Sequence, residues 1–286
     1  MLEYVLISLF SMTVLSVWSN VNFKAIEIWK ILFCVLVAFS LATGYIKPIA
    51  IIWLIIPFVA FTYENKISNK YVFFVYRLAL FIYLLAMGLN LFPGFNKFVL
   101  VPEQLLGNSG TPFGLSYTLA KPIAGLIVFG FIASRTKSFT ELKTTLFSAR
   151  GFLNWFVPAV LLLCIGYLIG LKVDIKWLAW FPLFFLTNLT LTVVQEEAFF
   201  RSFIQQPLHN RFGKKLWILP VAALPFALVH TPHGHVNLIA FYGVLFLAGM
   251  LYAWSYYKSE RLESVIATHW MVNIVHILFL TYPLTF

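Results

Sequence analysis

The chain has few charged residues and almost no cysteine. Only 10% of its 286 residues are charged, whereas 61% are hydrophobic, and a soluble domain carries about 25% charged residues. This deficit excludes a soluble globular protein and indicates an integral membrane protein. The two cysteines, Cys34 and Cys164, lie in apolar segments and bracket no recognisable pattern, which argues against a disulfide or a cysteine metal site. We expect both to be buried as small hydrophobic residues.

Long hydrophobic runs are what the sequence has in abundance. A membrane-spanning helix needs about 20 mostly apolar residues, and the first segment lacks the basic n-region and cleavage site of a signal peptide. Because that segment is short, and because another contains Lys121 and Pro122, the number of spans is open. We predict an all-α fold, a polytopic membrane helix bundle of about eight to ten transmembrane helices. The candidate spans are 2–18, 25–44, 47–63, 71–92, 115–134, 152–171, 176–206, 214–230, 236–257 and 264–282.

The net charge of +10 reflects orientation in a lipid bilayer and not binding of nucleic acid. The basic residues are spread through loops, with no groove motif of aromatic and basic residues. If the loop 201–215 is cytoplasmic, the cytoplasmic segments hold fourteen basic residues and the opposite side five, as the positive-inside rule requires. Both termini are then outside the cytoplasm. We expect a multi-pass protein of the bacterial inner membrane or of an endomembrane.

The two parts of the chain differ in their polar content. Residues 1–150 contain hydrophobic spans and one isolated intramembrane charge, Arg77, whereas residues 151–286 contain the intramembrane glutamates and all six histidines. We therefore expect function in 151–286 and leave 1–150 as an N-terminal transmembrane region of unassigned role. The turn-rich segment 93–114 reads as a connecting loop, with a re-entrant segment as the alternative. No internal repeat is visible, so an inverted-repeat transporter gains no support.

Three charged residues interrupt one hydrophobic segment. Glu196, Glu197 and Arg201 lie within LTNLTLTVVQEEAFFRSFIQQ, residues 186–206, and a charge at mid-bilayer costs at least about 2.5–3.5 kcal/mol. On a helix Glu197 and Arg201 are four positions apart and share a face, so they can neutralise each other. Glu196 is turned about 100° away, which predicts a reactive carboxylate beside a structural ion pair. The alternative is a buried charge network that carries out no chemistry.

Histidines mark a second polar segment. His230 ends a span in the motif FALVH, and His233 and His235 follow after a proline, so we interpret the latter two as loop residues. A metal cluster of all three remains an alternative. It would need a specially folded loop, because H-x-x-H-x-H is not the spacing of a helix face.

The last span carries a third polar set. His269, Asn273 and His276 lie on one helical face, and a polar stripe within lipid must face other helices or a water-filled cavity. We interpret His276 as a residue that packs or makes a hydrogen bond and takes no part in the chemistry. If the three helices enter from the same side of the membrane, their polar groups lie in overlapping layers. The sequence therefore predicts an intramembrane polar catalytic cavity.

These motifs resemble those of the CPBP intramembrane endopeptidases. In order along the chain they are EEAFFR (EExxxR), FALVH (FxxxH) and HWMVN (HxxxN), and the stretch FLAGMLYAWSYYKSERLESVIATHWMVN looks like the family's penultimate-helix region. Each motif is weak alone, but three in order on successive helices are specific. The family includes type II CAAX prenyl endopeptidases and bacteriocin-processing or immunity proteases. The resemblance covers roughly residues 151–286.

The resemblance implies an intramembrane protease and a role for each matching residue. Glu196 corresponds to the catalytic glutamate and His230 to its partner in activating water, while His269 and Asn273 would stabilise the oxyanion. The other two residues complete the first motif. The candidate catalytic residues are Glu196, Glu197, Arg201, His230, His269 and Asn273.

The resemblance leaves metal dependence open. The motifs lack the H-E-x-x-H that places two histidines and a base on one helical turn, which favours a glutamate mechanism without a metal or other cofactor. The alternative is a metalloprotease in which Glu196, His230 and His269 bind zinc as a set of two histidines and one carboxylate.

Two other classes of function compete with a protease. A proton- or ion-coupled transporter would use the two glutamates as carriers, and a catalytically silent membrane scaffold would keep the fold without the reaction. For a protease, we expect the partner to be a membrane protein or peptide substrate. It would be a prenylated C-terminal peptide, a leader peptide or bacteriocin, or the transmembrane anchor of another protein. The sequence does not indicate the oligomeric state.

Overall fold

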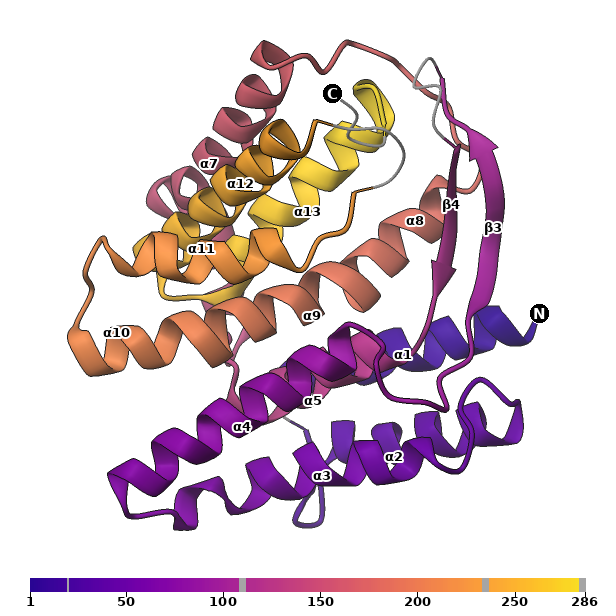
Figure 1. Cartoon of the computed structure of the whole chain (residues 1–286), viewed down its shortest axis with the longest axis vertical. Coiled ribbons are helices and arrows are strands. Elements are labelled where there is room, and N and C mark those ends of the chain that lie inside the picture. Colours follow the sequence, from indigo (N-terminus) through magenta and orange to yellow (C-terminus); the bar gives the residue numbers. More distant parts are fainter. Residues whose placement is uncertain (20, 108–111, 233–236, 283–286) are drawn as a thin grey trace. The chain divides into compact units, whose positions relative to one another are not determined.

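The chain is mostly helical (Figure 1). The computed structural model describes residues 1–19, 21–107, 112–232 and 237–282. Backbone contacts group the chain into two compact units. Unit 1 comprises Met1–Val99 and Ser116–Ile132, and unit 2 comprises Leu100–Leu115 and Ala133–Phe286.

Unit 1 is a helical bundle with α5 (Ala120–Ile132) in its core. Ten of the thirteen α5 residues are buried. Gly130 lets the Trp29 ring approach closely, because a Cβ there would come within 2.6 Å of the ring. The other elements are α1 (Leu2–Ser19), β1 (Asn22–Phe23), β2 (Ile26–Glu27), α2 (Ile28–Ala42), α3 (Ala50–Tyr63), the 3-10 turn η1 (Glu64–Lys66) and α4 (Lys70–Gly88).

Arg77, the isolated charge of the N-terminal region, has an ion-pair partner. Its guanidinium group contacts the carboxylate of Glu64, which is only 8% exposed and lies in the 3-10 turn between α3 and α4. Arg77 is partly buried, and pairing with the opposite charge of Glu64 neutralises it. Arg77 therefore gives no sign of a second functional site.

The segment 93–114 contains strands and is not a plain connecting loop. β3 (Phe98–Leu105) and β4 (Pro112–Tyr117) form a two-stranded sheet, and they run in opposite directions (Figure 1). At Gly114 a Cβ would lie 2.8 Å from the carbonyl oxygen of Val101, so the close strand approach requires glycine. The all-α prediction is wrong here, because hydropathy detects long apolar runs and misses short strands separated by turn residues.

Unit 2 carries the polar motifs on closely packed helices. Gly249 lies against α11, where a Cβ would be 3.0 Å from the Ala223 backbone, and small residues of this kind let membrane helices approach. Ser148 caps one helix by accepting a hydrogen bond from the Gly151 amide. Besides the helix that carries EEAFFR, this unit contains α6 (Phe139–Phe147), α7 (Ala149–Leu168), α11 (Ile218–Leu228), α12 (Leu238–Ser259) and α13 (Leu262–Phe279).

A long helix with two π-helical segments carries the two adjacent glutamates. The π-helices η2 (Asn188–Val193) and η3 (Ala198–Gln205) flank α9 (Val194–Glu197), and α8 (Phe181–Thr187) and α10 (Gln206–Phe212) continue the helix at each end. The side chain of Gln195 in α9 donates a hydrogen bond at 2.6 Å to the Thr190 carbonyl in η2. π-helical turns are frequent at functional sites. Here they change the rotation of the side chains on either side of the glutamates.

In the part of the chain that the structure describes, five helices are long and apolar enough to cross a membrane, namely α1, α4, α7, α12 and α13. α2, α5 and α11 are apolar but shorter, with 15, 13 and 11 residues. α11 begins four residues later and ends two residues earlier than the predicted span 214–230. Pro232 disfavours helical geometry at the residue before it, so the helix ends ahead of that position. The protein is thus a helical membrane protein, and the number of eight to ten spans stays a prediction.

Both cysteines are free and exposed on helix surfaces, so the prediction that they are buried is wrong. Hydropathy cannot separate lipid-facing from interior positions, because both are apolar. The division into 1–150 and 151–286 stays a prediction, since contacts group residues by packing and not by role.

Candidate active site

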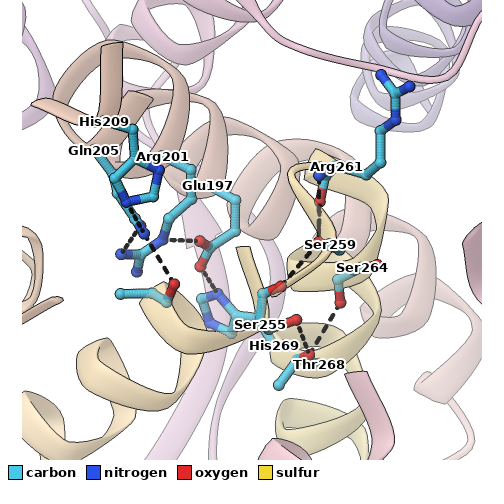
Figure 2. A network of polar contacts seen from close by, with 11 residues as sticks. Glu197, Arg201, Gln205, His209, Ser255, Ser259, Arg261, Ser264, Thr268 and His269 are labelled. Carbon is cyan, nitrogen blue, oxygen red and sulfur yellow. Dashed lines mark hydrogen bonds and ion pairs between the residues drawn. The ribbon is translucent and has the colours of Figure 1, made fainter. Parts of the chain in front are cut away.

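Glu197 lies at the centre of a buried polar network (Figure 2). Its side chain is completely buried, and its two oxygens have different partners. Oε2 accepts a hydrogen bond from Nε of Arg201 at 2.8 Å, and Oε1 lies 2.7 Å from Nδ1 of His269. The predicted pair of Glu197 and Arg201 therefore forms. The same carboxylate also connects the first motif to the third, which the sequence did not predict.

The network pairs charges that are closed off from solvent. Arg201 is completely buried, and its Nη1 donates to Oε1 of Gln205 at 3.3 Å. The amide nitrogen of Gln205 donates to the Ala253 carbonyl of α12 at 2.9 Å. Buried charges are stable only when they are paired and hydrogen-bonded. Sequence analysis missed Gln205, although its spacing of four from Arg201 places the two residues on one helical face.

Glu196 is also inside the protein. It precedes Glu197 in α9 and is 5% exposed. Neither glutamate of the EEAFFR motif therefore faces lipid, as expected for ionisable groups at membrane depth.

His230 follows the end of α11, and its imidazole is held by that helix. Its Nδ1 lies 2.6 Å from the carbonyl oxygen of Phe226. A carbonyl only accepts, so Nδ1 carries the proton, and the neutral ring then has its lone pair on Nε2. The Phe226 ring contacts both imidazoles, with centroid distances of 4.7 Å to His230 and 5.9 Å to His269. The second and third motifs thus meet at one aromatic ring.

The polar stripe of α13 faces the helix that carries the glutamates, as predicted. His269 contacts α9 through Glu197, and Nδ2 of Asn273 donates to Oδ1 of Asn188, the first residue of η2, at 3.2 Å. Sequence analysis missed Asn188, a polar residue within the apolar run of that helix. His276 lies 3.0 Å from the carbonyl oxygen of Thr281, a local backbone contact.

The three remaining histidines are His209, His233 and His235. His233 and His235 lie outside the described residues. His209 lies in α10, where its Nε2 is 3.4 Å from the amide nitrogen of Gln205. His209 therefore contacts the network at Gln205, as Figure 2 shows.

The residues proposed for zinc do not form a metal site in this arrangement. Nδ1 of His269 is bound to a carboxylate and Nδ1 of His230 to a carbonyl. Within residues 1–19, 21–107, 112–232 and 237–282, no three His, Cys, Asp or Glu side chains are gathered to hold a metal ion. The contacts at Nδ1 leave Nε2 of each neutral histidine able to bind a metal, so metal dependence stays a prediction, and we derive no step through a metal.

A family comparison matches the part of the chain that forms this network. Residues 178–275 match the family model described as type II CAAX prenyl endopeptidase Rce1-like. The chain carries a domain of the CPBP intramembrane protease family. All three motifs lie within the matched residues. No curated protein and no solved structure matches the chain.

The Rce1-like match agrees with the hydrophobic composition of the chain as well as with its polar motifs. A family of CAAX-type endopeptidases acts on membrane-associated peptides, and the five long apolar helices make this chain an integral membrane protein. The match includes α8 to α12 and most of α13. Unit 1 and the strands β3 and β4 lie outside it.

Proposed function

We propose that this protein is a glutamate-type intramembrane endopeptidase in which Glu196 and His230 activate a water molecule. The observation that supports it best is the Glu197 carboxylate, which binds both Arg201 and His269. This contact joins two motifs that are 72 residues apart in the sequence. It also brings the His269 ring of α13 to Glu197, the residue next to Glu196 in the sequence.

Hydrolysis in this proposal begins with proton transfer from water. Glu196 takes the proton while the water oxygen bonds to the peptide carbonyl carbon, and the carbonyl oxygen becomes an oxyanion. Glu196 then returns the proton to the leaving nitrogen as the C–N bond breaks. Nε2 of His230, whose tautomer the Phe226 carbonyl sets, accepts a hydrogen bond from the same water and orients it.

Two groups on α13 are proposed to stabilise the oxyanion. Asn273 uses one amide hydrogen for Asn188 and retains a second for the substrate oxygen. His269 can donate from Nε2 only as an imidazolium, because Nδ1 already donates to Glu197. Donors fixed in this way contribute about 3–4 kcal/mol to transition-state stabilisation.

We propose a prenylated C-terminal peptide as the substrate, because the matched family model is that of the CAAX prenyl endopeptidases. Leader peptides or bacteriocins, and the membrane anchors of other proteins, are the other substrates that the wider CPBP family suggests. The proposed location is the bacterial inner membrane, with the loop 201–215 in the cytoplasm.

Purified protein and a fluorogenic farnesylated CAAX peptide test the proposal. Glu196→Gln and His230→Gln should abolish cleavage while elution and melting of the protein stay unchanged. Glu263→Gln is the matched control, because Glu263 is also a buried glutamate, 4% exposed, but lies outside the three motifs and binds Thr136. Equal loss in all three variants, or undiminished cleavage by Glu196→Gln, would refute the assigned chemistry.

A further inference from the structure

We propose that Gln205 is a positioning residue for the reaction, acting through Arg201 and Glu197 on the orientation of His269. The inference rests on the proposed function. Gln205 lies outside the three motifs, and we propose that it acts on His269 indirectly. Its side chain is completely buried, and it lies at the end of η3, two helical turns after Glu197. It binds Arg201 and the adjacent helix α12.

The orientation of the Gln205 amide is fixed by its neighbours. Arg201 has only donors, so Oε1 must face its Nη1. The Ala253 carbonyl has only lone pairs, so Nε2 must face it. The second hydrogen on Nε2 is directed toward Nε2 of His209 at 3.4 Å. A flipped amide would place donor against donor and acceptor against acceptor, so one rotamer is strongly preferred.

This fixed amide sets the plane of the guanidinium group. Nη1 of Arg201 is held by Gln205 while Nε binds Oε2 of Glu197. Two contacts on one rigid, planar group determine its direction, whereas one contact leaves it free to rotate about the bond. The carboxylate of Glu197 is oriented in turn, and with it the hydrogen bond to Nδ1 of His269.

Gln205 also ties this network to α12, which packs on α13. Its contact with Ala253 joins η3 to α12, and His269 of α13 stacks on Tyr252, the neighbour of Ala253, with a centroid distance of 4.4 Å. The His269 ring is thus fixed on one side by Glu197 and on another by α12. Gln205 contacts both Arg201, which binds Glu197, and Ala253 of α12.

Three substitutions separate this role from general stability. Gln205→Leu has a similar size but offers Arg201 no acceptor and Ala253 no donor. Gln205→Glu keeps an acceptor for Arg201, and its protonated carboxyl also supplies a donor. Gln206→Leu is the matched control, because Gln206 is the same residue type one position later, half-buried, at the start of α10.

Two measurements on the full-length protein in detergent provide the test. The first is cleavage of the farnesylated peptide, where Gln205→Leu should lower kcat by about 100-fold with little change in KM. Gln205→Glu should retain more of kcat, most clearly at low pH, and Gln206→Leu should retain all of it. The second is the ¹H signal of Nδ1–H of His269 in ¹⁵N-histidine spectra, assigned by its loss in His269→Gln. It should shift or disappear in Gln205→Leu and remain in Gln206→Leu.

The outcomes distinguish this inference from the proposed function. If wild-type protein cleaves no peptide but the His269 signal depends on Gln205, the positioning contact stands and the proposed function fails. If wild-type protein is active and Gln205→Leu keeps kcat within about twofold, the inference is wrong. A fall in kcat with an unchanged His269 signal would also overturn it, because the effect would not pass through His269.

Discussion

Removing the Glu197 carboxylate should destabilise the protein far more than removing an exposed carboxylate from a similar ion pair. In Glu197→Ala the guanidinium of Arg201 stays completely buried, and of its described contacts only that to Gln205 remains. Breaking a buried pair on one side costs about 3–5 kcal/mol. Glu260 pairs with Lys214 at 2.5 Å, but these side chains are 62% and 41% exposed. Glu260→Ala should therefore cost only about 0.2–1 kcal/mol.

Thermal melting followed by tryptophan fluorescence measures this contrast in detergent. For a protein of this size, 1 kcal/mol corresponds to about 2–4 °C in Tm. Glu197→Ala should therefore lower Tm by roughly 6–20 °C, and Glu260→Ala by at most about 4 °C. Glu197→Gln should lie between them, because it keeps the shape of the side chain. Equal shifts for Glu197→Ala and Glu260→Ala would refute the argument that the buried pair stabilises the fold.

Further predictions concern the oxyanion, the metal, the loop histidines and pH. Asn273→Asp removes the amide donor while keeping the shape and should cut turnover by about 100-fold or more; turnover within threefold of wild type would exclude Asn273 from oxyanion binding. A strong chelator should leave turnover unchanged, whereas a loss that zinc restores would establish a metal mechanism. His233→Ala and His235→Ala should be nearly neutral in the same assay, and a large loss at either would revive a histidine metal cluster. The hydrogen bond from Lys214 lowers the pKa of Glu260 below its ordinary value of 4.5, so its stabilisation is present above that pH and lost as the pH falls below it. Tm should therefore depend less on pH below 4.5 in Lys214→Met than in wild type, and identical profiles would contradict this contribution.

The sequence predicted the contacts that depend on local spacing. Glu197 and Arg201 are four positions apart, and they pair as an ordinary helical spacing suggests, even though the helix is π-helical after Glu197. The polar stripe of α13 was assigned to the protein interior because lipid excludes it, and His269 and Asn273 do contact the helix that carries the glutamates.

Contacts across distant segments were beyond prediction. Nothing in the sequence near Glu197 indicates that its second oxygen binds His269, because the partner depends on how α13 packs against α9. Asn188 and Gln205 were missed for the same reason, since each is an ordinary polar residue until its partner is placed. The strands β3 and β4 were missed because strand pairing in a turn-rich segment leaves no hydropathy signal.

Proteomic analysis of membranes tests the central claim most directly, because it requires no assumption about the substrate. Membranes containing the wild-type protein are compared with membranes containing Glu196→Gln at equal abundance, and new peptide ends are identified by mass spectrometry. The account predicts cleavage products with the wild-type protein that are absent with Glu196→Gln and present with Glu263→Gln. Identical sets of peptide ends in the wild-type and Glu196→Gln membranes would contradict an endopeptidase that uses Glu196 to activate water.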